Sequence, residues 1–535
     1  MRSWRLRAIA SVVSAATVGV SLPIIAAAPA GATEAGRPMV YGWGNAAHAQ
    51  IADGSTAIHY EPTGMTQIPD QYFDGQANQL LPVTPASIVG GTDNALMLTT
   101  TGQVFSWGGN ANGEAYGNSA VAGNATIPPT YIDLAGSFGG RTATKVGTSD
   151  SNTSYALLNN GGWLVGWGSN TNNLLGGGTS PSAPRLIAQG VLSFGCGSDS
   201  CLATKDNGSG GTELWGWGSG ANGTFGEGGA TSHPTPTLLS TPITNPVEVA
   251  GGNRYTIVLD KAGVVHAMGV NTNGELGDGT TNGSSSPVTV QFPAGTPPIA
   301  HIYSGVFTSY AIDTAGHLWS WGYGGNGIIG LGNFNDADAP VQIVNDVYGH
   351  PIGQVAKVAA GWGTAQVLTT SGSVFVMGSN TTGELGNGEL AGSIAAPRYL
   401  PLPRSATDVG FTVDSVNRTA YTVLTDPSAT PMTRTGGTII STVASGSGGS
   451  SDPTVYQPYS QLSESDATGA NRMTLNPQGS RSSLYPAISP DGTRVAYAVT
   501  HSIVDATTKC EIGVTKPGRN AKEADRLEIT HFKKV

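Results

Sequence analysis

Charged side chains are scarce in this sequence, where Asp, Glu, Lys and Arg make up only 11% of the 535 residues. Catalytic signatures are missing as well. The sequence contains no His-Glu-x-x-His zinc motif, no Gly-x-Ser-x-Gly nucleophile turn and no phosphate-binding Gly-Lys-Ser/Thr loop, and its nine histidines are scattered. These absences predict a protein that is not an enzyme and that needs no metal or other cofactor.

Long apolar runs are missing everywhere except at the N-terminus. There, three arginines (Arg2, Arg5 and Arg7) precede an apolar stretch from Ala8 to Ile25, and Ala30-Gly31-Ala32 has the form of a cleavage site. The pattern predicts a secretory signal peptide over residues 1–32, cut after Ala32, and an extracellular mature chain without membrane insertion. A retained membrane anchor is the alternative, which the polar and Pro residues inside the stretch disfavour.

Cysteine is the third scarcity, with three residues. Cys196 and Cys201 bracket a Gly-Ser-Asp-Ser turn between two short apolar segments, so a cross-hairpin disulfide is feasible if their Cα atoms lie within about 7 Å. Closing so short a loop would contribute about 2 kcal/mol. Metal binding by two cysteines without a nearby histidine is the weaker interpretation. Cys510 is left over, either free or in an intermolecular bond.

Glycine, by contrast, is abundant, at 78 residues, and it is periodic. A short strand ending in Trp-Gly or Met-Gly recurs at intervals of 64, 60, 50, 51, 53 and 56 residues. The recurring residues are Trp43, Trp107, Trp167, Trp217, Met268, Trp321 and Met377. A period near 50 with two strands per glycine-bounded unit predicts a repeat architecture, most simply the blades of a β-propeller.

The segments after these pairs share a sequence as well as a spacing. They read NANGEAYGN (110–118), NTNGELGDG (271–279) and NTTGELGNG (380–388), with looser copies at 219–228 and 324–332 and a degenerate one at 42–54. Together with the preceding Trp/Met-Gly, this pattern resembles the regulator of chromosome condensation repeat over residues 40–426. The resemblance implies an all-β, seven-bladed propeller. The family includes secreted bacterial propellers that bind and inhibit β-lactamases.

The two ends of the repeat region are each half a unit. Residues 40–45 form a second half without a first, and residues 408–426 form a first half without a following Trp-Gly. We therefore expect 408–426 to pair with 40–44 and complete one blade from both ends of a domain that spans 33–426. Such closure removes the exposed sheet edges that would otherwise aggregate.

The sequence changes character after residue 426. Ser, Gly, Thr and Pro dominate 427–455, which predicts a linker. Within 456–535, the stretch LYPAISPDGTRVAYAV (484–499) resembles a blade of the TolB-like propellers. The resemblance implies a short, incomplete blade segment, with outer strands near 510–514 and 525–530.

Charge is uneven along the chain. Residues 33–426 carry 26 acidic side chains against 11 basic ones, a net charge of −15. Such a surface repels phosphate backbones, so we expect no nucleic-acid partner. It would instead speed encounters with basic proteins. We expect a monomer.

Residues that recur at one position of the repeat have a structural interpretation. The strand-end Trp and Met residues are expected to pack between blades. Glu114, Glu275 and Glu384, one position before an apolar residue and Gly, are expected to satisfy backbone groups in their turn.

Residues that break the repeat are the better binding candidates, because loops on a rigid scaffold carry specificity. The loop after the first strand of each unit is such a place, and in equivalent blades all seven loops open on one face near the axis. The binding-face candidates in these loops are Asp93, Asn94, Asn253, Arg254, Tyr255, Phe307 and Trp362. Aromatic residues and Arg dominate binding hot spots. The alternative is that each ring packs under its own loop.

These observations favour a secreted, non-catalytic propeller that binds a folded protein, with a β-lactamase or penicillin-binding protein implied by the family resemblance alone. The first alternative is guanine-nucleotide exchange, the function that names the family, which the signal peptide and the acidic charge disfavour. A light sensor of this fold is a further alternative, of which Gly361-Trp362-Gly363-Thr364 carries only a superficial trace. The last is a secreted enzyme with carboxylates facing each other in the propeller funnel.

Overall fold

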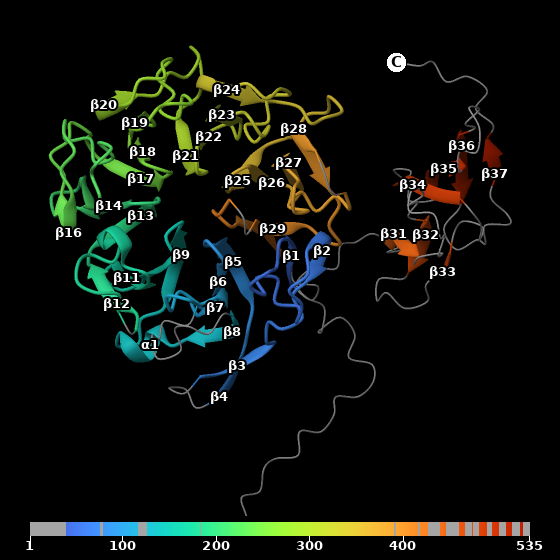
Figure 1. The fold of residues 1–535 in the computed structure, drawn as a ribbon, viewed down its shortest axis with the longest axis horizontal. Coiled ribbons are helices and arrows are strands. Elements are labelled where there is room, and N and C mark those ends of the chain that lie inside the picture. Colours follow the sequence, from blue (N-terminus) through green and yellow to red (C-terminus); the bar gives the residue numbers. More distant parts are fainter. Residues whose placement is uncertain are drawn as a thin grey trace, which may run out of the picture.

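Seven four-stranded antiparallel sheets stand around a common axis as blades of a closed ring (Figure 1). The computed structural model describes residues 39–74, 79–115, 126–181, 183–389, 392–415 and 418–425, and beyond these the backbone of seven strands between 439 and 527. The expected all-β, seven-bladed propeller is confirmed. The expected signal peptide, at residues 1–32, lies outside the described residues.

Each blade runs from an inner strand at the axis to an outer strand at the rim. Blade 1 is β5 (Pro85–Gly90), β6 (Asn94–Thr99), β7 (Val104–Gly109) and β8 (Thr126–Ile132). Blade 2 is β9 (Ala143–Ser149), β10 (Thr153–Leu158), β11 (Trp163–Gly168) and β12 (Arg185–Ala188). Blade 3 is β13 (Val191–Cys196), β14 (Ser200–Asp206), β15 (Thr212–Gly218) and β16 (His233–Leu238).

The next three blades follow in the same order. Blade 4 is β17 (Pro246–Gly251), β18 (Tyr255–Asp260), β19 (Val265–Gly269) and β20 (Ser284–Thr289). Blade 5 is β21 (Ile299–Ser304), β22 (Thr308–Asp313), β23 (Leu318–Gly322) and β24 (Ala337–Ile343). Blade 6 is β25 (Val355–Ala360), β26 (Thr364–Thr369), β27 (Val374–Ser379) and β28 (Ser393–Leu400).

Blade 7 is assembled from both ends of the repeat region. Its order is β29 (Ala406–Phe411), β30 (Thr419–Leu424), β1 (Val40–Gly44) and β2 (His59–Gly64). Strands β1 and β30 pair antiparallel without a break, from Val40 opposite Val423 to Gly44 opposite Thr419. The expected closure of the ring is therefore confirmed.

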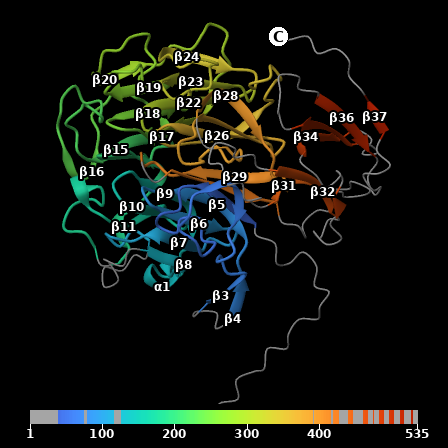
Figure 2. The same cartoon turned by 45° about the vertical axis from the view of Figure 1, so that its right-hand side comes forward.

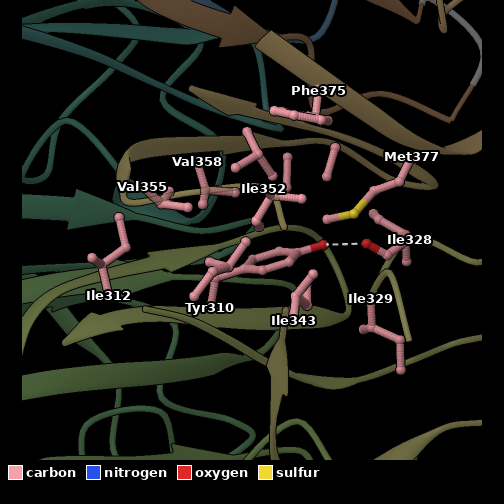
Figure 3. Close-up of a cluster of buried hydrophobic side chains, with 14 residues drawn as sticks. Tyr310, Ile312, Ile328, Ile329, Ile343, Ile352, Val355, Val358, Phe375 and Met377 are labelled. Atoms are coloured by element: carbon pink, nitrogen blue, oxygen red, sulfur yellow. Dashed lines mark hydrogen bonds between the residues drawn. The ribbon is translucent and has the colours of Figure 1, made fainter. Parts of the chain in front are cut away.

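The second strand of each blade is buried along almost its whole length, as in β6, β22 and β26. A neighbouring blade covers each face of the sheet, so both sets of alternating side chains are apolar or hydrogen-bonded. The interface between two neighbouring blades is called a seam below. Figure 3 shows the seam between blades 5 and 6, where Tyr310 and Ile328 of blade 5 meet Val358 and Met377 of blade 6. The Tyr310 hydroxyl donates to the Ile328 carbonyl at 2.7 Å.

The recurring strand-end residues join each blade to the one before it, as the repeat predicts. Trp43 Nε1 donates to the carbonyl of Glu384, Trp167 to that of Glu114 and Trp321 to that of Glu275, each at 2.9 Å. The segment after each Trp/Met-Gly pair, which we call the tail, has a glycine that makes room for the indole ring. A Cβ on Gly386, for example, would lie 2.8 Å from the Trp43 side chain, and the φ of Gly386 is +61°. The indoles are fully buried.

The recurring glutamates fold back onto their own tails. The carboxylate of Glu114 accepts the backbone N–H of Asn112, that of Glu275 the N–H of Asn273, and that of Glu384 the N–H of Thr382. The predicted structural role of this position is therefore confirmed. The three carboxylates differ in what their second oxygen contacts.

A few elements lie outside the seven sheets. The hairpin β3 (Gln71–Asp74) and β4 (Gln79–Pro82) projects from the rim in both views (Figure 1, Figure 2). The helical turns are α1 (Leu134–Ser137) and η2 (Thr171–Asn173). Cys196 and Cys201 form a disulfide across the β13–β14 pair, with Cα atoms 4.1 Å apart.

Two further sheets follow the ring. The first is β31 (Ile439–Ser445), β32 (Tyr459–Ser465) and β33 (Met473–Thr474), so that β31 falls within the segment for which the sequence predicts a linker. The second is β34 (Arg481–Ile488), β35 (Val495–His501), β36 (Cys510–Thr515) and β37 (Asp525–Leu527). Both lie outside the ring in Figure 1. The likeness of this region to a TolB-like blade stays a prediction.

Candidate functional site

The loops between the first and second strands of the blades meet around the axis on one face, and we call them the axial loop ring. They comprise residues 91–93, 150–152, 197–199, 252–254, 305–307, 361–363 and 412–415. The Ser151 hydroxyl donates to the Ser198 carbonyl at 2.6 Å, and the backbone N–H of Asn253 donates to the Val306 carbonyl at 2.8 Å. The N–H of Val413 donates to the Gly91 carbonyl at 3.1 Å. Neighbouring blades thus hold the loops against one another.

Partly exposed aromatic side chains gather on blades 5 and 6 of this ring, and we call Phe307, Tyr323 and Trp362 the aromatic arc. The loops that carry Phe307 and Trp362 are in contact, since the N–H of Val306 donates to the Gly361 carbonyl at 3.3 Å. Phe307 packs edge-on against Tyr323, with ring centroids 6.4 Å apart. The arc is therefore a preformed apolar surface.

Trp362 is held from below by a buried cation. The Arg418 guanidinium carbon lies 4.7 Å from the centroid of the Trp362 ring, and Arg418 is only 7% exposed. Its Nη1 donates to Glu384 Oε1 at 3.0 Å. A cation fixed against the ring face orients the indole, which stays partly exposed.

Carboxylates occupy the remaining part of the ring, and we call Asp93, Asp150, Asp199 and Asp414, from blades 1, 2, 3 and 7, the acidic arc. Burial raises the pKa of Asp150 to about 7, with the charges of Asp199 and Asp414 adding to the rise. Burial likewise raises the pKa of Asp93 and of Asp199. Glu114, in the tail of blade 1, is fully buried, and burial raises its pKa to about 7, with the charge of Asp93 adding to the rise.

Two basic residues flank the acidic arc. His48 Nδ1 lies 3.9 Å from Asp93 Oδ2, and the charge of Arg254 opposes the rise in the pKa of Asp199. Arg254 is exposed, at a backbone φ of +63°. A left-handed backbone is unfavourable for Arg, so the loop geometry is imposed by its neighbours and presents this side chain to solvent.

Two of the predicted binding residues are wrong. Asn94 and Tyr255 are each 1% exposed, because each is the first residue of a second strand rather than the last of a loop. The Tyr255 hydroxyl donates to the Thr308 carbonyl at 2.6 Å, and Asn94 Nδ2 donates to Ser154 Oγ at 3.1 Å. Both residues join neighbouring blades and belong to the core.

The other five candidates lie on the axial loop ring: Asp93, Asn253, Arg254, Phe307 and Trp362. Phe307 and Trp362 lie on adjacent blades, as expected. Asp150, Asp199, Asp414 and Tyr323 were missed. The three aspartates stand in the equivalent loops of blades 2, 3 and 7, so aligning the units on their inner strands would have found them.

Charged residues in the inner strands serve the ring itself. Asp408 accepts the N–H of Ile88 at 2.8 Å and the Lys357 ammonium at 2.6 Å. Glu248 accepts the N–H of Ile302 at 3.2 Å and lies 3.5 Å from His301 Nδ1. These carboxylates bridge adjacent inner strands and are occupied by that task, which weakens the interpretation of an active site in the funnel.

Within the described part of the chain, no three His, Cys, Asp or Glu side chains are arranged to hold a metal ion. Among the same residues, no helix is long and apolar enough to cross a membrane.

Comparison with known proteins identifies the repeats. The family model of the regulator of chromosome condensation (RCC1) repeat matches residues 213–259, 262–312 and 315–367, and a second model of this repeat matches 86–114. The chain is 28% identical over 244 residues to the ultraviolet-B receptor UVR8 of Arabidopsis thaliana, covering 44% of this chain and 53% of the receptor. It is 28% identical over 310 residues to the E3 ubiquitin-protein ligase HERC2 of Mus musculus, covering 56% of this chain and 6% of the ligase.

The chain thus spans about half the length of the first relative and a small part of the second. Among solved structures, Prp20p of Saccharomyces cerevisiae aligns with a TM-score of 0.59 at 18% identity, covering 72% of this chain and 92% of Prp20p. At this identity the likeness concerns the fold. The matched segments and the closed ring agree: the chain is a seven-bladed β-propeller that contains regulator of chromosome condensation repeats.

Proposed function

We propose that this protein is a secreted, monomeric, non-catalytic propeller that binds a folded protein partner through its axial loop ring. The observation that carries the proposal is the aromatic arc, in which Phe307 and Trp362 stay partly exposed on adjacent, hydrogen-bonded loops. Exposed rings on a rigid surface bind with little loss of conformational entropy. The equivalent loop positions of the other blades carry polar or small residues, an asymmetry that core packing alone does not require.

The scaffold supports a binding role in two further ways. Closure of the ring and the hydrogen bonds between loops fix the binding surface before a partner arrives, which lowers the ordering cost of association. The net charge of −15 over residues 33–426 favours encounter with a basic partner, so association should slow as salt rises. Among the structural neighbours, Prp20p has binding properties to Gsp1p and histones, which are proteins.

The compartment and the partner class rest on the sequence. The pattern of residues 1–32 supports secretion with cleavage after Ala32. Mass spectrometry of the secreted protein should find Thr33 at its N-terminus. The resemblance to secreted bacterial propellers that inhibit β-lactamases makes a β-lactamase and a penicillin-binding protein the first partners to test.

The experiment measures binding of the purified chain to these two enzymes, together with β-lactam hydrolysis by the first. Trp362→Ala and Phe307→Ala should each weaken binding by about 2 kcal/mol, roughly 30-fold, with nearly unchanged thermal stability. Tyr399→Ala is the matched control, because Tyr399 is an aromatic residue 50% exposed on the outer strand β28, away from the loops. It should leave binding unchanged.

Two results would count against the proposal. If Trp362→Ala or Phe307→Ala unfolds the protein, those rings are core residues and the surface is wrongly placed. If neither enzyme binds, capture from culture supernatant with the native protein and Trp362→Ala side by side tests for any other partner. Equal retention by both would remove the loop ring as the binding surface.

A further inference from the structure

The three recurring tail glutamates differ at their second carboxylate oxygen. Glu384 Oε1 accepts Arg418 Nη1 at 3.0 Å, and Glu275 Oε1 accepts Asn273 Nδ2 at 2.6 Å. Glu114 Oε1 is buried and accepts no hydrogen bond from the described residues. Glu114 itself is fully buried. One copy of a repeated carboxylate therefore lacks the donor that its counterparts have.

The residue that faces Glu114 explains the difference. Asn152 holds in blade 2 the place that Arg418 holds in blade 7, directly before the second strand. A Cβ on Gly168 would touch both the Asn152 carbonyl and the Glu114 backbone, so the two residues pack against the same glycine. Among the described residues, the seam between blades 1 and 2 thus has the carboxylate but not the cation.

More unpartnered acceptors lie above this seam. Asp93 Oδ1, Asp150 Oδ1 and Asp199 Oδ1 are also buried atoms that accept no hydrogen bond from the described residues. The charge of Asp93 acts on Glu114, and the charges of Asp199 and Asp414 act on Asp150. The Ser151–Ser198 hydrogen bond joins the loops of Asp150 and Asp199, and the Val413–Gly91 hydrogen bond joins those of Asp414 and Asp93, so these carboxylates gather in one part of the ring.

The charged groups facing this cluster can be named one by one. His48 faces Asp93, Arg254 faces Asp199, and Asp414 faces both Asp93 and Asp150. The described charged groups that act on Asp150 and Glu114 are all acidic. A buried carboxylate oxygen that accepts no hydrogen bond is unfavourable, and two kinds of change relieve it: a proton, or a cation that donates hydrogen bonds.

A basic side chain fits this site better than a metal ion does. The described residues offer no arrangement of three ligands for a metal. A guanidinium or ammonium group, by contrast, supplies several donors directed at separate oxygens. Asp93, Asp150 and Asp199 are partly exposed and can meet such a group from solvent, whereas Glu114 is fully buried.

We propose that the acidic arc receives an arginine or lysine side chain from the partner, as the cationic counterpart of the contact that the partner makes with the aromatic arc. This proposal rests on the proposed protein-binding function and specifies the partner as one with an exposed basic residue beside an apolar one. The internal Arg418–Glu384 pair is an example, within the same ring, of a guanidinium paired with a carboxylate.

Binding of this kind depends on pH in a defined direction. The cation requires ionised carboxylates, and the pKa values of Asp150 and Glu114 are raised to about 7. Affinity should be full at pH 8 and fall as pH drops through about 7, because protons then compete with the partner's cation.

The test uses a displayed library of disulfide-constrained seven-residue peptides, selected at pH 8 on the purified full chain. We expect the selected peptides to be rich in Arg or Lys, and to lose at least 10-fold in affinity in Asp150→Asn, in Asp199→Asn, and at pH 5.5 for the native protein. Asp206→Asn is the control of equal charge, because Asp206 is exposed at the far end of β14. It should leave affinity unchanged. Thermal melting verifies that each variant is folded.

Each other outcome overturns either the cation site alone or the proposed function as well. Peptides that lose affinity in Trp362→Ala but bind Asp150→Asn and Asp199→Asn as tightly as the native protein overturn the cation site and leave the proposed function standing. Peptides that bind equally to all of these variants overturn both. Selected peptides without a basic residue also overturn the cation site.

Discussion

The seam between blades 6 and 7 and the seam between blades 1 and 2 contain the same repeated glutamate in opposite states. At the first seam, Glu384 is neutralised by Arg418, which in turn supports Trp362. At the second, Asn152 holds the place of Arg418, and no cation among the described residues pairs with Glu114. A compensated carboxylate stabilises the ring, whereas an uncompensated one costs stability. This loss of stability lies on the side of the ring that carries the acidic arc, where a bound cation would offset it.

The largest expected effect comes from removing the blade that forms one side of the compensated seam. Deletion of residues 408–426 removes most of β29 and all of β30, and exposes the edge of β1 together with the face of blade 6 that packs against β29. Unpaired edges template aggregation. We expect insoluble or aggregated protein by size-exclusion chromatography. A soluble monomer with unchanged thermal stability would contradict the role of closure.

Removing the Arg418 side chain alone should lower the stability of the protein by the next largest amount. Arg418→Ala leaves the fully buried Glu384 carboxylate without its ion pair, which typically costs about 3–5 kcal/mol. Denaturant unfolding measures the loss. Glu384→Gln in the same chain is the control, since it removes the stranded charge and should recover a large part of the stability. No recovery would mean that Arg418 acts mainly by packing under Trp362.

The disulfide tests how firmly one loop of the acidic arc is held. Cys196 and Cys201 flank the loop that carries Asp199, and closing this short loop should contribute about 2 kcal/mol. Replacing both cysteines by serine should lower the free energy of unfolding by that amount. Free thiols at both positions in the native secreted protein, by mass spectrometry, would contradict this role of the disulfide.

The uncompensated seam should reveal itself as a pH dependence of stability. Glu114 and Asp150, with pKa values raised to about 7, bind protons more tightly in the folded state than in the unfolded state. Their contribution is therefore most favourable below the ordinary carboxyl pKa, falls as pH rises, and is fully lost above about 7. Stability should rise as pH drops from 8 to about 6.

Asp150→Asn and Glu114→Gln should flatten this dependence and raise stability at pH 8 by about 1–2 kcal/mol, since one pKa unit corresponds to about 1.4 kcal/mol and solvent screening reduces the gain. Thermal melting at both pH values measures it. Asp206→Asn serves again as the control and should leave the slope unchanged. If stability changed with pH equally in the native protein and in all of these variants, groups other than Asp150 and Glu114 would cause the pH dependence.

Much of the fold could be predicted because its periodic residues have local tasks. The spacing of the Trp-Gly pairs and of the tail glutamates predicts the blades, and the half units at 40–45 and 408–426 predict the closure of the ring. The binding surface was predicted less well. Tyr255 and Asn94 differ from loop residues by one position, and only the start of each second strand shows which side of that boundary they occupy.

The sequence by itself determined the number of blades, their order and the closure of the ring, since each depends on motifs contained within one unit. Only the tertiary structure decided which loop residues meet around the axis, because their neighbours come from blades about 50 residues apart in the chain. It also decided the state of each repeated glutamate. Burial and partner set the charge of a carboxylate, and the cation that pairs with Glu384 is Arg418 of the next blade, where the equivalent residue beside Glu114 is Asn152.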